Sequence, residues 1–246
     1  MSQSQERIDF RYILDGILKV FNFEKGLFLT TRELLLRPGN MIKDYLSGAR
    51  RKYTHPIQFV FVYVGLWALF LNQFKLDNAG FLQGFENGMG NVGLEKGREI
   101  DAEEIAAIQD WMAAGFDYFF QYQNVYNIAL IPLLSLLTYL FYRKFKLYYP
   151  EHLVLNAYIT GMISFIGLLF APIAFFDFGT TIVLGGLAGF LYTIWVYMDT
   201  FKGYSIGGFF KSLALNLSFY LLTVLLVFTV FVSYLLLFFA KTAEIG

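Results

Sequence analysis

Five mostly apolar stretches alternate with polar segments along the 246-residue chain. A helix needs about 20 such residues to cross the hydrocarbon layer of a bilayer. The pattern therefore predicts an all-α polytopic membrane protein with about five transmembrane helices. The predicted spans cover residues 57–74, 125–142, 153–176, 181–198 and 213–240. Only residues 177–180 separate the third span from the fourth, which predicts a tight antiparallel hairpin.

Residues 1–56 have a different pattern, in which apolar side chains recur at helical spacing and polar ones fill the other faces. We predict cytoplasmic interfacial amphipathic helices here, the first around residues 10–21. Thr30 and Glu33 have the spacing of a capping box, which predicts that a short helix begins at Thr30. Pro38 and Gly39 should end that helix and precede another. The chain thus divides into this segment and a five-helix membrane domain at 57–240, with an external loop at 75–124 in which a helix is expected after Asp101.

The positions of Lys and Arg predict the orientation, because cytoplasmic loops retain them. With the N-terminus in the cytoplasm, residues 1–56, 143–152 and 200–212 carry ten, three and two Lys/Arg, and the other side carries four. We therefore expect a multi-pass protein of the inner (plasma) membrane with its N-terminus in the cytoplasm and its C-terminus outside.

Composition removes several classes of chemistry. The chain has no Cys, two His and a formal net charge of zero, so we expect no metal centre, no cofactor and no nucleic-acid partner. Motifs for a nucleophilic serine, a zinc protease, a P-loop or a dinucleotide fold are absent, and no catalytic residue can be named. The sequence leaves enzymatic activity open and favours a non-enzymatic protein.

Basic residues cluster just before the first span, where they favour contact with an anionic leaflet. A simpler explanation is that they only set the topology. Glu151, His152 and Asp199 lie at the same predicted membrane face. Glu151 suits the cap of the third span, and either acid could pair with an arginine of the cluster and dock the N-terminal segment onto the bundle. The candidate lipid- or partner-binding residues are Arg37, Arg50, Arg51, Lys52, His55, Glu151, His152 and Asp199.

The spans carry no Lys, Arg, Asp or Glu near their centres, which disfavours an ion- or proton-coupled transporter. Gly185 and Gly189 form a G-x-x-x-G pattern that indicates close helix packing, either inside the bundle against the third span or between two copies. A small permease or channel subunit lined by Asn156, Asn216 and tyrosines remains an alternative. A third is a lipid-modifying enzyme that uses Glu151, His152 and Asp199.

The segment TTRELLLRPGNMIKDYLSGARRKYTHP, residues 30–56, resembles the membrane family called domain of unknown function 3667 (DUF3667). The resemblance lies in a T-x-R-E-L-x-x-R-P-G run, a Y-L-x-G-x-R-x-x-Y run and a proline at the start of the first span. Glu151 and His152 are similar to an acidic–His pair of that family. The resemblance implies the same membrane architecture and no particular activity. Many members carry an N-terminal zinc ribbon with two Cys-x-x-Cys pairs, which this chain lacks.

These observations lead to one hypothesis: a lipid- or partner-binding membrane protein that uses a cytoplasmic Arg-rich collar. The expected partners are membrane lipids with anionic headgroups, with a second copy of the chain or another membrane protein as alternatives.

Overall fold

The computed structural model describes residues 26–71, 115, 122 and 125–243. The amphipathic helix predicted at 10–21 and most of the loop at 75–124 lie outside the described residues. The described elements are helical. They are α2 (Phe28–Leu36), α3 (Pro38–Leu46), η2 (Arg50–Lys52), α4 (Pro56–Leu71), α7 (Ile131–Phe141), η3 (Arg143–Phe145), α8 (Tyr149–Phe170), η4 (Ala171–Phe175), α9 (Phe178–Thr200) and α10 (Ile206–Ala243).

Four helical stretches are long and apolar enough to cross a membrane, which confirms an all-α polytopic membrane protein. They are Arg50–Leu71, Tyr149–Phe175, Gly179–Thr200 and Ile206–Val230. The second predicted span corresponds to a shorter apolar helix at Val125–Phe141. A turn at Leu130 interrupts it, and Pro132 lies in the first turn of α7, where a missing N–H costs no helical hydrogen bond.

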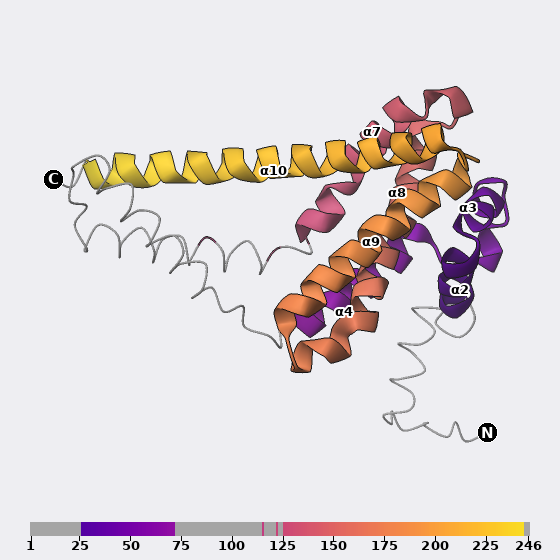
Figure 1. The fold of residues 1–246 in the computed structure, drawn as a ribbon, viewed down its shortest axis with the longest axis horizontal. Helices are drawn as coiled ribbons and strands as arrows, with labels where there is room; N and C mark the ends of the chain where they lie inside the picture. The colour runs from indigo at the N-terminus through magenta and orange to yellow at the C-terminus, as the bar shows by residue number, and fades with distance from the viewer. Residues whose placement is uncertain (1–25, 72–114, 116–121, 123–124, 244–246) are drawn as a thin grey trace, which may run out of the picture.

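The bundle is arranged around α8, which packs against α4, α7 and α9 (Figure 1). The predicted hairpin between the third and fourth spans forms through η4. Asp177 caps α9 there by accepting from the backbone N–H groups of Gly179 and Thr180. The longest helix, α10, packs against α7 and α9 near its start and then extends away from them (Figure 1). Its 38 residues rise about 57 Å, well beyond the hydrocarbon thickness of about 30 Å.

The predicted capping box at Thr30 is wrong, because α2 begins two residues earlier and Thr30 lies inside it. Its hydroxyl donates to the carbonyl of Gly26 at 2.6 Å and accepts from the backbone N–H of Thr54 at 2.9 Å. Glu33 makes no capping bond and pairs with arginines instead. A threonine that can cap a helix locally therefore joins α2 to the residues just before α4.

A polar core cluster joins α7, α8 and α9 inside the apolar bundle. It consists of Ser135, Thr138, His152, Asn156 and Tyr197, all less than 1% exposed. The amide nitrogen of Asn156 donates to the hydroxyls of Ser135 (3.1 Å) and Thr138 (2.9 Å) and to the carbonyl of His152 (2.9 Å). The hydroxyl of Tyr197 donates to the amide oxygen of Asn156 at 2.9 Å. Hydrocarbon offers these groups no partner, so they pair across helices.

Replacing Asn156 with Ala should lower the free energy of unfolding by about 1–3 kcal/mol, because several buried partners lose a hydrogen bond at once. Denaturation in mixed detergent micelles measures this. The matched control is Asn40→Ala, whose side chain is exposed on α3 and which should change stability by less than about 0.5 kcal/mol. Equal effects of the two substitutions would contradict a role of the cluster in holding the bundle together.

Candidate functional site

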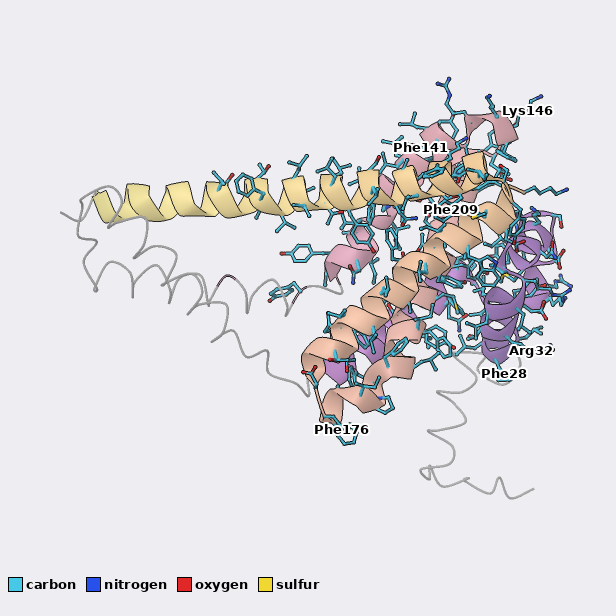
Figure 2. The ribbon with its side chains drawn as sticks, viewed as in Figure 1. Phe28, Arg32, Phe141, Lys146, Phe176 and Phe209 are labelled. Carbon is cyan, nitrogen blue, oxygen red and sulfur yellow. The ribbon has the colours of Figure 1, made fainter. Side chains whose placement is uncertain are left out.

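The basic side chains of the described residues up to Val230 gather on one side of the bundle. They lie on the segment before α4, the connections from α7 to α8 and from α9 to α10, and the first turns of α10. They are Arg32, Arg37, Lys43, Arg50, Arg51, Lys52, Arg143, Lys144, Lys146, Lys202 and Lys211. Glu33, Asp44, Glu151 and Asp199 are the acids of the same segments, and Asp177 lies in the opposite hairpin. In Figure 2, Lys146 and Phe176 mark the two ends of the bundle. We call this strongly positive side the basic face.

The η2 turn, Arg50–Lys52, is an exposed part of the basic face and lies directly before α4. Its position is fixed by the two residues that follow. The Tyr53 hydroxyl donates to the Asp44 carboxylate at 3.1 Å. The Thr54 carbonyl accepts from the Tyr158 hydroxyl of α8 at 2.6 Å. Within the described part of the chain, neither Arg50 nor Arg51 forms an ion pair. Both guanidinium groups are therefore exposed on a turn that the hydrogen bonds of Tyr53 and Thr54 hold in place.

Lys52 and His55 are the other two candidate residues of this segment. Lys52 lies over the ring of Tyr53, with its ammonium nitrogen 5.0 Å from the ring centroid. His55 is exposed just before α4.

Arg37 differs from its neighbours on η2 because it is paired with a carboxylate. Its Nε donates to Glu33 Oε2, and Arg32 Nη1 lies 3.6 Å from Glu33 Oε1. Glu33 itself is only 4% exposed. The hydrogen bond to Glu33 raises the pKa of Arg37 above its ordinary value, so the guanidinium stays charged.

Asp199 joins the N-terminal helices to the last turn of α9. Its Oδ2 accepts from the backbone N–H of Gly39 at 2.7 Å, and its Oδ1 accepts from the Tyr204 hydroxyl at 2.8 Å. Lys43 donates to the Asp199 carbonyl at 3.3 Å. Burial lowers the pKa of Lys43, and the nearby Asp199 carboxylate opposes that shift. We call this group the Asp199 clasp. We expected Glu151 or Asp199 to pair with Arg50 or Arg51. Among the described residues, Asp199 instead contacts Gly39 and Lys43 of α3.

Glu151 and His152 are neighbours in sequence and have separate surroundings. Glu151 accepts from the backbone N–H of Tyr148 at 2.7 Å and so caps α8. His152 is 0% exposed, with Nδ1 3.1 Å from the Thr138 hydroxyl and the ring stacked on Phe201. Its Nε2 has no hydrogen-bond partner among the described residues. The structure thus places Glu151 at the membrane end of α8 and His152 in the polar core cluster, and does not bring them together with Asp199 as one constellation.

Gly185 and Gly189 lie in the interface between α9 and α8. A Cβ added to Gly185 would lie 3.5 Å from the Cα of Gly167, and one added to Gly189 would lie 3.1 Å from Ile163 Cγ2. The two glycines therefore allow α9 to approach α8 inside one chain.

Sequence reasoning missed most groups that hold the basic face in place. Thr31 Oγ1 lies 2.6 Å from the Tyr63 hydroxyl, and the Tyr192 hydroxyl donates to the Leu34 carbonyl at 3.1 Å. Tyrosines inside apolar spans were the available signal, since a buried hydroxyl requires a partner.

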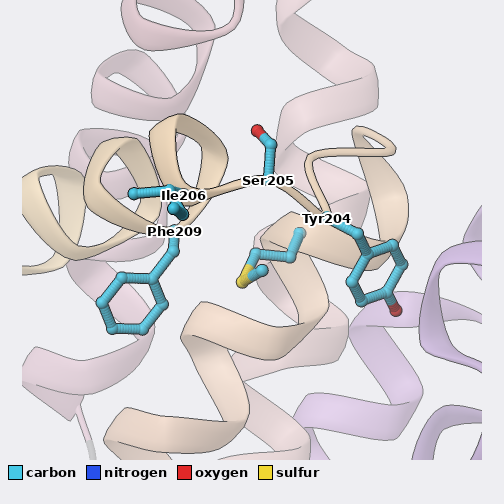
Figure 3. A pocket seen from close by; sticks show the side chains of 5 residues that line it. Tyr204, Ser205, Ile206 and Phe209 are labelled. Carbon is cyan, nitrogen blue, oxygen red and sulfur yellow. The ribbon is translucent and has the colours of Figure 1, made fainter.

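A shallow, mostly apolar pocket lies beside the clasp, between the end of α9 and the start of α10 (Figure 3). Its lining residues are Met198, Tyr204, Ser205, Ile206 and Phe209. No group of three or more His, Cys, Asp or Glu that could hold a metal ion occurs among the residues that the structure describes.

Fold and site together define a multi-pass α-helical membrane protein with one strongly basic side. The family described as "Protein of unknown function (DUF3667)" matches residues 24–67, which confirms the resemblance over α2, α3, η2 and most of α4. Comparison with curated proteins and with solved structures gave no match.

Gly39→Ala should undo the clasp, because the new Cβ would lie 2.5 Å from the carbonyl carbon of Asp199. We expect a loss of about 1–3 kcal/mol in the free energy of unfolding. Gly65→Ala is the control: it lies in α4 with no atom within 4 Å of the added Cβ, and Ala is the better helix former. Chemical denaturation in one detergent should give opposite signs for the two variants. A Gly39→Ala protein as stable as the parent would contradict the clasp.

Proposed function

We propose that this protein is a non-enzymatic membrane protein whose basic face binds anionic lipid headgroups in the leaflet on the side of the N-terminal helices. The observation that carries the proposal is the η2 turn. Arg50 and Arg51 are exposed and lack ion-pair partners among the described residues, and the hydrogen bonds of Tyr53 and Thr54 hold the turn in place.

The geometry of the η2 turn supports lipid binding by Arg50 and Arg51 in addition to a role in orienting the chain in the membrane. A topology signal needs only charge, and flexible basic residues supply it equally well. Here two planar guanidinium groups project from one short helical turn, and each can donate in a fork to phosphate oxygens. Each basic residue near an anionic leaflet contributes about 1 kcal/mol. A turn whose flanking residues are held by hydrogen bonds loses less backbone entropy on binding than a flexible segment.

The proposal includes the orientation. Because cytoplasmic loops retain Lys and Arg, the basic face is the cytoplasmic face of an inner membrane, with the N-terminus inside. Anionic lipids are enriched in that leaflet in many cells. Their headgroups would then lie on the same side of the membrane as the basic face.

The two alternatives find less support. A lipid-modifying enzyme would need Glu151, His152 and Asp199 around one headgroup, whereas these side chains serve a helix cap, the polar core cluster and the clasp. A permease lined by Asn156 and Asn216 would need these amides to face a pore. Both are buried, at 0% and 3% exposure, and Asn156 is bonded within the cluster.

Replacing Arg50 and Arg51 by Gln should reduce the anionic lipid retained by the purified protein. Native mass spectrometry after titration with mixed phosphatidylglycerol and phosphatidylcholine measures the preference between the two lipids. We expect the preference for phosphatidylglycerol to fall about tenfold or more, since two bases of about 1 kcal/mol each are lost. The control is Lys144→Gln with Lys146→Gln, an exposed basic pair at the end of η3 that removes the same charge. The Arg variant should lower the preference further than this control, because only η2 presents two guanidinium forks. An unchanged preference in the Arg variant would show that η2 only sets topology.

A further inference from the structure

Helix α2 lies beside α4 and α9, at the level of residues inside these helices and not of their ends. Its contacts reach Tyr63, seven residues after the start of α4, and Tyr192, eight residues before the end of α9. At about 1.5 Å per residue, these positions are about 10–12 Å from the ends of their helices. That depth is typical of an interfacial helix whose apolar face enters the boundary between headgroups and acyl chains.

The outer side of α2 combines apolar side chains with one arginine. Phe28 is 76% exposed and Leu36 63%, and Leu35 is also exposed. Arg32 belongs to the same stripe, because positions 28, 32, 35 and 36 share one helix face. Figure 2 shows Phe28 and Arg32 near the end of α2 at which the helix begins. Such a stripe beside membrane spans is suited to lipid, with a long arginine side chain that reaches up to the headgroups.

Arg32 of this stripe and Arg37 at the end of α2 share one carboxylate, that of Glu33. Arg32 approaches Glu33 Oε1 and Arg37 donates to Oε2, so the triad carries a net charge of +1. Each guanidinium has five N–H donors, and each uses only one nitrogen on Glu33. Both arginine side chains remain about half exposed, at 58% and 52%. An uncompensated positive charge next to hydrocarbon is costly, and a monoanion would neutralise it.

We propose that the Arg32–Glu33–Arg37 triad binds the phosphodiester of one phospholipid, whose acyl chains lie along Phe28, Leu35 and Leu36. A phosphodiester carries one negative charge and acceptor oxygens for both forks. The inference rests on the proposed lipid-binding function and makes it specific. The triad recognises the phosphodiester that all phospholipids share, whereas the η2 turn selects headgroups with a net negative charge.

The test is native mass spectrometry of delipidated protein titrated with phosphatidylglycerol, phosphatidylcholine or diacylglycerol, which has no phosphate. Arg32→Gln is compared with Lys144→Gln, which removes an exposed basic side chain without an ion pair among the described residues. We expect Arg32→Gln to lose one tightly held phospholipid of either headgroup, with affinity lower by about tenfold or more. Lys144→Gln should retain it, and diacylglycerol should bind the parent weakly. Arg32→Lys keeps the charge beside Glu33 and loses the fork, so it should also weaken binding. It is the variant to use if Arg32→Gln does not fold.

Three outcomes would overturn the inference. One is equal retention of phospholipid by Arg32→Gln, Arg32→Lys and the parent. Another is retention of diacylglycerol as strongly as phospholipid. The third is displacement of the lipid by millimolar inorganic phosphate, which would make the triad a site for a free anion. Failure of the proposed function looks different: Arg50→Gln with Arg51→Gln would leave the preference for phosphatidylglycerol over phosphatidylcholine unchanged.

Discussion

The carboxylate of Asp199 is the contact on which the arrangement of the basic side depends. It accepts the backbone N–H of Gly39 and so connects the last turn of α9 to the first turn of α3. Without it, α3 would lose its side-chain hydrogen bond to the last turn of α9. With it, the segment is held at both ends, and the tyrosines at 63, 158 and 192 bond it in between. The arginines of this segment therefore occupy defined positions relative to the spans.

The run that resembles DUF3667 has a physical explanation in this arrangement. Glu33 is the buried carboxylate that Arg32 and Arg37 share, and Pro38 supplies a first helical residue that needs no N–H partner. Gly39 is required because α9 passes so close that no Cβ fits. Leu34 offers its carbonyl to Tyr192 while its side chain is buried in the core. Charge, turn and close approach thus occur together in ten residues because they build one joint between the N-terminal helices and the bundle.

Hydropathy predicted the spans because a bilayer imposes length and apolarity on a helix directly, and the break at Pro38 followed from local backbone chemistry. The joint could not be predicted in the same way. Asp199 and Gly39 are 160 residues apart, and Tyr192 and Leu34 are 158 apart, so no periodicity connects them. Thr30 illustrates the difficulty: its spacing to Glu33 is that of a local cap, yet its tertiary partner is Thr54. Asn156 was recognised as polar within a span, but its partners on α7 and α9 depend on how those helices pack.

We expect the N-terminal helices to be docked rigidly on the bundle in a bilayer. Because the chain has no cysteine, one cysteine can be introduced at Asn40 on α3 and one at Lys202 just after α9. Both positions are exposed, and the doubly substituted protein is spin-labelled at these two sites. The distance between the two labels is measured by double electron–electron resonance in nanodiscs that contain phosphatidylglycerol. A single short and narrow distance distribution is the result that docking predicts. A broad distribution extending to long distances would show that the segment moves independently of the bundle and would contradict the account.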